Sequence, residues 1–394
     1  MKLHQSYFSI IPLALSAFCM GVAELSMAGI LNNLADSFNI SPSQAGYLTT
    51  FYALGVIIGA PLLSIPLSSL HRKAQLSVNL GIFALGNLII FLSSDFYLTA
   101  FARFVCGCMH GVFFVIATLT CTQVAQKGKE SQALALMVSG LTISMVSGVP
   151  LGAMIGNTYG YQFLFLCITI LTLCVLLSVI CVMPKNIQGQ KTRISGLMDG
   201  LKSLQMWRSF LITAGFCGSI FTFYTYVEPF FMDLGGFAHQ ELSLVLLIYG
   251  AFGILGNLIG GKLADRLGAI VCLRLTLSLL ALSLFGLMFS IHYPLVAVAN
   301  FCMVSFWGFS CVASVKILAL WSAKRYTPDN VESSISLNEA SFNLGIAIAT
   351  LAGGLTLAHL GVEFNPLIAS FVALGALVLI PKKDLFNPLE SRVD

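Results

Sequence analysis

Twelve long apolar stretches, separated by short polar gaps, run the length of the chain. Their approximate bounds are 10–34, 44–65, 74–93, 96–124, 132–156, 161–183, 209–232, 240–261, 270–291, 294–318, 332–358 and 365–381. A helix needs about 20 predominantly apolar residues to cross the hydrocarbon core of a bilayer. The pattern therefore predicts twelve transmembrane helices, and it leaves too few residues for a soluble domain of ordinary size.

The composition fits a membrane protein. Of the 394 residues, 57% are hydrophobic and 9% are charged, whereas roughly a quarter of the residues of soluble proteins are charged. The cysteines all lie in apolar stretches without the spacing of a zinc site, so we expect small buried hydrophobes and no metal or other cofactor. The first stretch is too long for the core of a signal peptide, and we expect it to be retained.

Basic residues occupy alternate gaps. Of the 20 Lys and Arg, all except Arg103 lie in or beside gaps that share one side of the membrane. The charged residues of the intervening gaps are Asp36, Asp95, Asp233 and Glu363. Because Lys and Arg collect in cytoplasmic loops, we expect both termini in the cytoplasm and the chain in the inner (plasma) membrane. The net charge of +4 sits at these lipid-facing loops and does not indicate a nucleic-acid partner.

The longest polar segment divides the twelve spans into two sets of six. We expect an N-terminal six-helix bundle over 1–183, a cytoplasmic linker over 184–208, and a second bundle over 209–394 that ends in a short cytoplasmic tail. Within the linker, 196–207 has the pattern of a short helix at the membrane surface. A short, basic, glycine-led turn follows the second span of each set, which indicates an internal repeat.

Seven short motifs occur in order on corresponding spans. They are Ala23-Glu24-Leu25, Tyr52-Ala53-Leu54-Gly55, Arg103 with Gly107 and Gly111, Gly148-Val149-Pro150-Leu151-Gly152, Tyr226-Val227-Glu228-Pro229-Phe230, Gly261 to Gly268, and Phe342-Asn343-Leu344-Gly345. Together they resemble the motifs of the major facilitator superfamily, in particular its twelve-span drug:proton antiporters. That branch includes bacterial sugar, purine-nucleoside and chloramphenicol exporters, and the resemblance covers essentially the whole chain.

This resemblance implies an all-α membrane protein of two pseudo-symmetric six-helix bundles. It also implies a monomer that exports a small organic solute, such as a sugar, a nucleoside or a drug-like molecule, in exchange for protons by alternating access. The first-half copy of the loop motif departs from the family, because Ser68 and Ser69 stand near the usual acidic residue. This departure argues against an aspartate-based gate lock in the first half.

An acid and a base inside the spans lie at matching depth. Glu24 is about 14 residues, or roughly 21 Å, from the cytoplasmic end of span one. Arg103 is about 7 residues from the outer end of span four, hence roughly 20 Å from the inner face of a core about 30 Å thick. Leaving water favours a neutral carboxyl group, whereas a nearby cation favours the ionised form. We therefore expect Glu24 to bind protons and Arg103 to tune it, the alternative being a static ion pair.

Further polar side chains extend this candidate site. His110 follows Arg103 by seven residues and shares its helical face, where it would contact substrate or shuttle protons unless it is a packed core histidine. Glu339 and Asn343 lie four residues apart on span eleven, Glu339 as a second proton site and Asn343 as a substrate contact. The remaining candidate substrate contacts are Tyr52, Tyr226 and Glu228.

Candidate gating residues lie on spans five and eight. Gly148, Pro150 and Gly152 are expected to let span five bend, since proline removes a backbone hydrogen bond; simple close packing is the alternative. The residues expected to lock the cytoplasmic end of span eight are Gly261, Asp265, Arg266 and Gly268. Lys316 lies near the inner end of span ten, where we expect its ammonium group to reach the lipid headgroups.

Other functions find less support in the residues. A proton-coupled importer of the same fold stays open, because these motifs do not encode direction. A membrane sensor without transport activity or a membrane enzyme is the alternative from another class. The sequence contains no GxxxxGK[ST], HExxH or GxSxG motif and no Cys/His cluster, so neither transport driven by ATP nor an enzyme is predicted.

Overall fold

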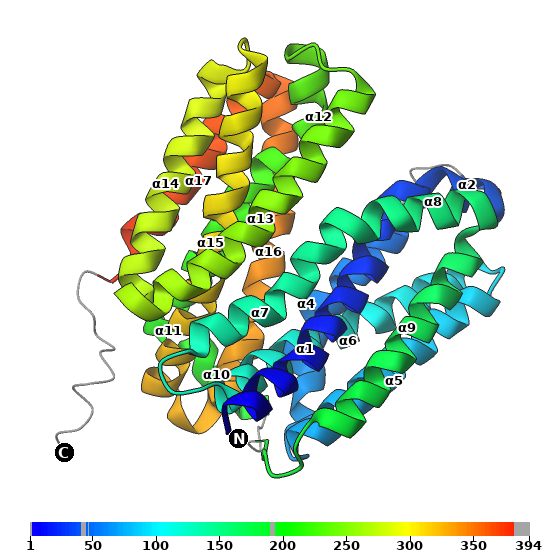
Figure 1. The fold of residues 1–394 in the computed structure, drawn as a ribbon, viewed down its shortest axis with the longest axis vertical. Coiled ribbons are helices and arrows are strands. Elements are labelled where there is room, and N and C mark those ends of the chain that lie inside the picture. Colours follow the sequence, from blue (N-terminus) through cyan, green and yellow to red (C-terminus); the bar gives the residue numbers. More distant parts are fainter. Residues whose placement is uncertain (1, 41–44, 46, 190–193, 382–394) are drawn as a thin grey trace. The chain divides into compact units, whose positions relative to one another are not determined.

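The computed structural model describes residues 2–40, 45, 47–189 and 194–381, and this part of the chain is almost entirely helical (Figure 1). Eleven of the described helices have the length and composition to cross a membrane. The seventh predicted span corresponds to α11 (Leu204–Tyr224), whose 21 residues are enough to cross a membrane. It is not among these eleven helices, and the polar residues Gln205 and Arg208 lie in its first turns. The prediction of an all-helical membrane protein is confirmed.

The first six predicted spans correspond to the helical segments before the linker. They are α1 (Lys2–Leu25), the 3-10 turn η1 (Ser26–Ile30), α2 (Leu31–Phe38), α4 (Tyr47–Leu67), α5 (Arg72–Leu92), α6 (Phe96–Val124), α7 (Glu130–Ile143), the π-helical turn η2 (Ser144–Gly148), α8 (Val149–Tyr159) and α9 (Tyr161–Val182). Span one is thus built from α1, η1 and α2, and span five from α7, η2 and α8.

The linker and the last six spans follow the same plan. Their elements are α10 (Ile194–Lys202), α11, α12 (Val227–Pro229), the π-helical turn η3 (Phe230–Leu234), α13 (His239–Leu267), α14 (Ala269–Ser290), α15 (Pro294–Tyr326), η4 (Pro328–Asn330), α16 (Val331–His359), η5 (Val362–Phe364) and α17 (Asn365–Leu379). Because α15 continues well beyond the predicted end of span ten, Lys316 lies inside the helix and is only 8% exposed. The prediction that Lys316 reaches the headgroups is wrong.

The contacts between residues divide the chain into two compact units. Unit 1 contains Met1–Met198 and Glu332–Asn343, and unit 2 contains Asp199–Val331 and Leu344–Asp394. The first part of α16 therefore belongs to unit 1 and the remainder to unit 2. The sequence-based division into 1–183, 184–208 and 209–394 stays a prediction.

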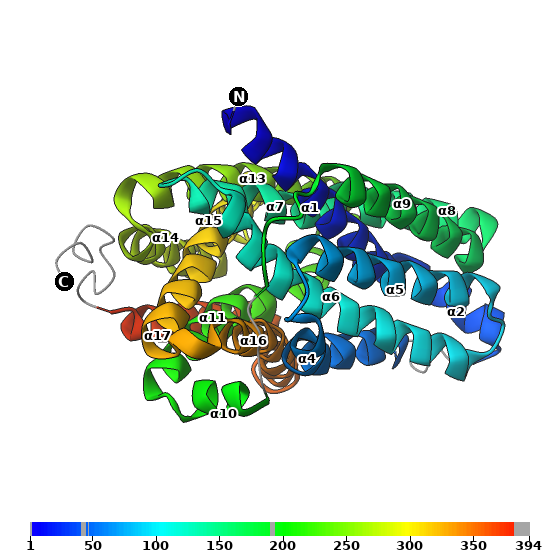
Figure 2. The ribbon, with the colours of Figure 1, turned by 90° about the horizontal axis from the view of Figure 1, so that it is seen from below.

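Each unit shows the same set of helix pairings. In unit 1, α6 packs on α4 and α5, while α9 packs on α1 and α5 (Figure 2). In unit 2, α15 packs on α13 and α14, while α17 packs on α11 and α14. The second set repeats the first in chain order, as the predicted internal repeat requires.

Polar caps and glycines set the helix ends. A carboxylate oxygen of Asp95 accepts a hydrogen bond of 2.7 Å from the backbone N–H of Leu98 at the start of α6, which satisfies one of the free donors of a first helical turn. Gly160 and Gly268 have φ angles of +90° and +83° at the turns after α8 and α13. An L side chain would be strained at both turns, so Gly268 has a structural reason to be glycine.

The backbones of α4 and α6 are in direct contact. A Cβ atom on Gly107 would overlap the carbonyl oxygen of Tyr52, and one on Gly59 would overlap the backbone of Cys108. Gly107 and Gly111 lie one helical turn apart, as do Gly55 and Gly59, so glycine surfaces of the small-xxx-small type face each other. Gly107 and Gly111 are therefore packing residues of the α4–α6 contact.

Helices α13 and α15 of unit 2 repeat this contact with one change. A Cβ atom on Gly256 would overlap the carbonyl of Phe306, and one on Gly260 would meet the backbone of Ser310. The hydroxyl of Ser310 donates to the carbonyl of Gly256 at 2.8 Å. A serine thus stands where α6 has Cys108, and the two helix pairs correspond residue by residue.

Spans one and five lose regular α-helix beside each other, at η1 and η2. The Ser26 hydroxyl donates to the Val22 carbonyl at 2.6 Å and lies 3.4 Å from the carbonyl oxygen of Gly148. Pro150, the second residue of α8, has no N–H to give to the preceding turn, which favours the π-helical turn before it. Span five is therefore interrupted at η2, while its expected bending stays a prediction; the side chain of Pro150 lies outside the described residues.

The glycine contact predicts a selective loss of stability. We expect Gly107→Ala to lower the free energy of unfolding by about 1–3 kcal/mol or more, because the methyl group would push α4 away from α6. The change can be followed in detergent as thermal exposure of the buried cysteines to a thiol-reactive fluorophore.

The matched control is Gly81→Ala on α5. Nothing lies within 4 Å of a Cβ atom built at Gly81, so we expect stability to stay unchanged or to rise by up to about 1 kcal/mol from the gain in helix propensity. Equal destabilisation by Gly81→Ala and Gly107→Ala would refute the assignment of the α4–α6 contact as the specific cause.

Candidate functional site

Glu24 is the second-last residue of α1 and immediately precedes the η1 break. Its side chain is 30% exposed, although its neighbour Ala23 is fully buried. A carboxylate within a membrane span is costly unless it meets water or a partner group. His110 lies beside Glu24 and provides such a partner group.

His110 joins Glu24 to Tyr52. The Nδ1 atom of His110 lies 3.7 Å from a carboxylate oxygen of Glu24 and 2.8 Å from the hydroxyl oxygen of Tyr52. The imidazole ring also makes an edge contact with the Tyr52 ring, at 5.6 Å between centroids, and a tilted contact with Phe114 at 5.1 Å. A protonated His110 can therefore pair with an ionised Glu24 while its ring is held between two aromatic side chains.

Arg103 is completely buried and is held by backbone carbonyl groups. Its Nη1 atom donates to the carbonyl of Ala23 at 2.8 Å, and its Nε atom donates to the carbonyl of Leu48 at 3.5 Å. The guanidinium carbon lies 4.2 Å above the centre of the Tyr52 ring, a favourable position for a cation. These contacts fix a positive charge at the junction of α1, α4 and α6.

Four side chains thus form one polar cluster: Glu24, Tyr52, Arg103 and His110. The predicted match in depth between Glu24 and Arg103 is confirmed, because Arg103 binds the carbonyl next to Glu24. Within the described residues, no ion pair of 4 Å or less joins the two side chains; His110 is the group that approaches the carboxylate.

The two candidates on span eleven lie on the part of α16 that belongs to unit 1. Glu339 is 7% exposed. The side-chain amide of Asn343 donates to the backbone carbonyl of Glu339 at 3.2 Å. This contact holds Asn343 along its own helix, so it supplies no bond to the Glu339 carboxylate.

The other predicted substrate contacts lie on unit 2. The ring of Tyr226 packs against the backbone at Gly353 and Gly354, where any added Cβ atom would meet it. Tyr226 is therefore held in a close helix contact. The side chain of Glu228 lies outside the described residues.

The predicted gating residues occupy two turns. Gly261, Asp265 and Arg266 lie in the last turns of α13, with Gly261 buried and Arg266 exposed. On span five, a Cβ atom at Gly148 or Gly152 would meet Val22 or Ser26 of span one. Their close packing is therefore visible, while their part in gating stays a prediction.

The second half replaces the buried arginine by a serine. Counting from the matched glycines of α4 and α13, Ser305 corresponds to Arg103 and Tyr249 corresponds to Leu48. The hydroxyl of Ser305 donates to the carbonyl of Tyr249 at 2.6 Å, just as Arg103 donates to the carbonyl of Leu48. The same backbone position is bonded in both repeats, but only the first repeat carries a charge there.

Aromatic rings occupy the neighbourhood of this neutral position. Tyr224 stacks on Tyr249 at 5.3 Å between ring centroids, and Tyr249 stacks on Phe301 at 4.3 Å. Tyr249 and Phe301 are buried and Tyr224 is partly exposed. The two repeats therefore differ in chemistry, with ionisable groups in unit 1 and stacked rings in unit 2.

A buried ion pair that the sequence did not reveal lies at the end of unit 1 that the charge pattern predicts to be cytoplasmic. Arg72 and Glu332 are 1% and 2% exposed, and their nearest side-chain atoms are 3.2 Å apart. Arg72 also donates to the side-chain oxygen of Gln75 at 2.7 Å and to that of Gln123 at 3.4 Å. No local pattern signals the pair, because its members are 260 residues apart in sequence.

The same region includes part of the linker. The backbone N–H of Arg72 donates to the carbonyl of Ile187 at 2.9 Å, and His71 forms an isolated antiparallel bridge with Gln188. The side-chain amide of Gln75 donates to three carbonyls of the loop between α4 and α5. The carboxylate that pairs with Arg72 in this region is supplied by α16.

Comparison with known proteins agrees with these observations. The sequence profile of the Major Facilitator Superfamily matches residues 13–322. The uncharacterized MFS-type transporter YtbD of Bacillus subtilis is 30% identical over 372 residues, which are 94% of each chain. The inner membrane transport protein YdhP of Escherichia coli (strain K12) is 31% identical over 377 residues, with 95% of each chain covered.

Solved structures share the fold at much lower identity. The human organic anion transporter MFSD10 aligns with a TM-score of 0.79 and 12% identity over 95% of this chain and 99% of that one. The fucose:proton symporter FucP of E. coli aligns with a TM-score of 0.75 and 14% identity over 95% and 98%. These alignments extend over both halves of the chain.

Breaking the buried ion pair is expected to be costly. Glu332→Gln leaves the guanidinium group of Arg72 buried without its carboxylate, which typically costs about 3–5 kcal/mol of folding free energy. Reversible unfolding in mixed micelles measures the loss.

Two further variants separate the ion pair from a general charge effect. The double variant Arg72→Met with Glu332→Leu removes both charges, and we expect it to recover most of the loss. Arg266→Gln removes an exposed charge and should change stability by no more than about 0.5 kcal/mol. If Glu332→Gln behaves like Arg266→Gln, the pair does not support the fold.

Proposed function

Because the chain belongs to the major facilitator superfamily, we propose that it is a proton-coupled secondary transporter that exports a small organic solute across the inner membrane. The family and its relatives establish a multi-pass membrane transporter rather than an enzyme. Proton coupling, export, a monomeric state and the inner membrane are parts of the proposal. The relative named as an inner membrane transport protein supports the last of these.

The polar cluster is the observation that carries the proposal. An ionisable group inside a span is expensive and commonly marks a path for ions or substrate. In this chain a partly exposed carboxylate, a histidine and a fixed guanidinium group meet where three helices join. The ion pair of Arg72 with Glu332 is almost fully buried, whereas the side chain of Glu24 is 30% exposed.

We assign different roles to the members of the cluster. Glu24 takes up and releases the proton, since it is the exposed acid. His110 pairs with the ionised carboxylate and leaves it when Glu24 is protonated, so the proton changes which contacts His110 can offer a solute. Arg103 stays fixed on Ala23 and favours return of Glu24 to the ionised form through its charge.

The second repeat supports a division of labour. Its equivalent position holds neutral Ser305 beside the Tyr224–Tyr249 stack, so protonation chemistry is assigned to the first repeat. Glu339 remains the second candidate for a coupled proton, because it is a buried acid of α16 and the other, Glu332, pairs with Arg72. The motifs shared with drug:proton antiporters support export, and a symporter working inward is the alternative that the transport assay decides.

The proton role predicts a specific defect in Glu24→Gln. A counterflow screen in proteoliposomes first identifies a transported solute. With that solute, we expect Glu24→Gln to lose accumulation driven by a pH gradient while keeping exchange of labelled for unlabelled solute, because the neutral amide mimics a permanently protonated carboxyl group.

Glu130→Gln, which changes an acid in the first turn of α7, is the control and should keep both activities. Gradient-driven accumulation by Glu24→Gln equal to that of the wild type would rule out the proton role. If the solute moves in the same direction as the protons, the chain is a symporter and export is wrong.

The fixed guanidinium group predicts a strong effect of a conservative change. A lysine ammonium cannot bind the carbonyls of Ala23 and Leu48 together and lie flat on Tyr52. We expect Arg103→Lys to lower the gradient-driven transport rate roughly tenfold or more, because the α1–α4–α6 junction loses its fixed geometry.

The internal repeat provides the matched control. Ser305→Ala removes the equivalent bond to a carbonyl in unit 2, and we expect transport to fall by less than about twofold, since one neutral hydrogen bond contributes about 1 kcal/mol to stability and none to the charge. A larger defect in Ser305→Ala than in Arg103→Lys would contradict the assignment of the charge to the first repeat.

A further inference from the structure

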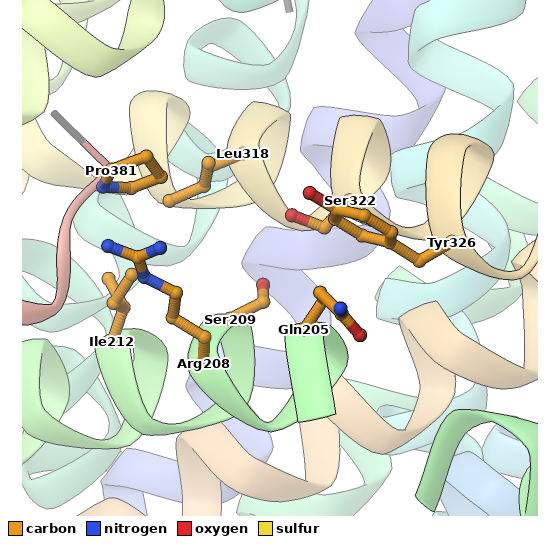
Figure 3. A pocket seen from close by; sticks show the side chains of 8 residues that line it. All are labelled: Gln205, Arg208, Ser209, Ile212, Leu318, Ser322, Tyr326 and Pro381. Atoms are coloured by element: carbon orange, nitrogen blue, oxygen red, sulfur yellow. The ribbon is translucent and has the colours of Figure 1, made fainter. Parts of the chain in front are cut away.

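A polar hollow opens at the cytoplasmic end of unit 2 (Figure 3). It lies between the start of α11, the last turns of α15 and the residue Pro381 that follows α17. Its free space is about 330 Å³, with the open mouth included. The polar side chains around it are Gln205, Arg208, Ser209, Ser322 and Tyr326.

Arg208 is the charged group of this hollow. Its Nε atom donates to the carbonyl of Leu379 at the end of α17. Within the described part of the chain, its two terminal nitrogens have no hydrogen bond to protein. A guanidinium group held by one edge presents the other edge as a fork of parallel donors, which is the geometry that binds phosphate oxygens.

The surroundings favour an anion over a cation. No carboxylate is among the described residues that line the hollow. Gln205 and Arg208 belong to the first turns of α11, where the helix dipole gives a partial positive charge. Side-chain hydroxyl groups of Ser209 and Ser322 point into the same space (Figure 3), and each can donate to an anionic oxygen.

The outer wall of α11 marks the level of the lipid headgroups. Leu204 is 79% exposed, and Leu211, two turns later, is 49% exposed. Between them Trp207 is 44% exposed, and its indole N–H donates to the carbonyl of Leu201 at 2.7 Å. Tryptophan collects at the membrane interface, and the basic-loop pattern assigns this end to the cytoplasm.

We propose that this hollow binds the phosphate group of an anionic phospholipid of the cytoplasmic leaflet, with Arg208 as the principal ligand. The terminal nitrogens of Arg208 contact two phosphate oxygens, and Gln205, Ser209 and Ser322 bond the remaining polar atoms of the headgroup. The acyl chains follow the exposed apolar side of α11. Basic pockets between membrane helices on the cytoplasmic side are suited to such headgroups.

The test compares lipid retention and thermal stability in vesicles of phosphatidylcholine with and without phosphatidylglycerol. We expect phosphatidylglycerol to raise the unfolding midpoint of the wild type and to remain bound in native mass spectrometry. Arg208→Gln should lose more than about half of that rise, together with the retained lipid, because the principal phosphate ligand is gone.

Arg274→Gln is the matched control. Arg274 also donates to a backbone carbonyl just beyond α17, that of Pro381, but its own side chain does not line the hollow. We expect Arg274→Gln to keep the full effect of phosphatidylglycerol. An equal loss in both variants would show that anchoring of α17, rather than a lipid site, produces the effect, and would overturn the proposal.

A second variant leaves Arg208 intact. We expect the double change of Gln205→Ala and Ser322→Ala to lower the phosphatidylglycerol-dependent rise while the midpoint in pure phosphatidylcholine stays near that of the wild type. A further arm adds inorganic phosphate or glycerol phosphate to detergent-solubilised protein. If either produces the full stabilisation in a manner that depends on Arg208, the hollow binds a soluble phosphate and the lipid assignment is wrong.

Discussion

Direct contact between the backbones of α4 and α6 fixes the geometry of the functional site. Glycines on both helices remove the side chains that would hold the backbones apart, and packing between small residues is a principal source of helix association in lipid. Tyr52 lies at this contact, and Arg103 and His110 stand on the helix opposite. The α4–α6 contact therefore fixes the backbone positions from which these three side chains extend.

The same close helix contact occurs in both repeats, but only the first repeat carries a charge there. In unit 2 the equivalent contact has Ser305 bonded to the carbonyl of Tyr249, so the architecture does not need a charge at this position. Helices α13 and α15 make the same contact without a charge, so α4 and α6 do not need the guanidinium group of Arg103 in order to pack. Such an addition inside a membrane is retained at an energetic cost, which is why the charged repeat is assigned to coupling.

Much of the fold could be predicted from the sequence because the bilayer imposes length and charge rules. The apolar runs predicted the spans, and the alternation of Lys and Arg predicted which loops face the cytoplasm. Counting residues from the ends of spans one and four predicted that Glu24 and Arg103 lie at the same depth. The extent of α15 was underestimated, so Lys316 was wrongly placed at the headgroups. A helix can continue beyond its apolar run wherever other helices cover it, and an apolar window cannot detect that.

The polar contacts were less predictable. His110 as the immediate neighbour of Glu24 depends on rotamers and on the α4–α6 contact, which residue spacing does not encode. The pair of Arg72 with Glu332 joins segments 260 residues apart, and each residue alone resembles an ordinary loop charge. The absence of the usual acidic residue near Ser68 could be seen in the sequence, but the pairing of Arg72 with Glu332 on α16 could not.

The interruption of span one at η1 explains an otherwise expensive feature of the site. The last carbonyl groups of an α-helix lack partners within it, and α1 ends at Leu25 in the apolar part of the molecule. The Arg103 side chain supplies a donor to one of these carbonyls, at Ala23. The arginine thus caps the end of α1 from another helix. The cation satisfies a carbonyl group that the broken span leaves without a partner, and that carbonyl in turn supplies a hydrogen bond to the buried cation.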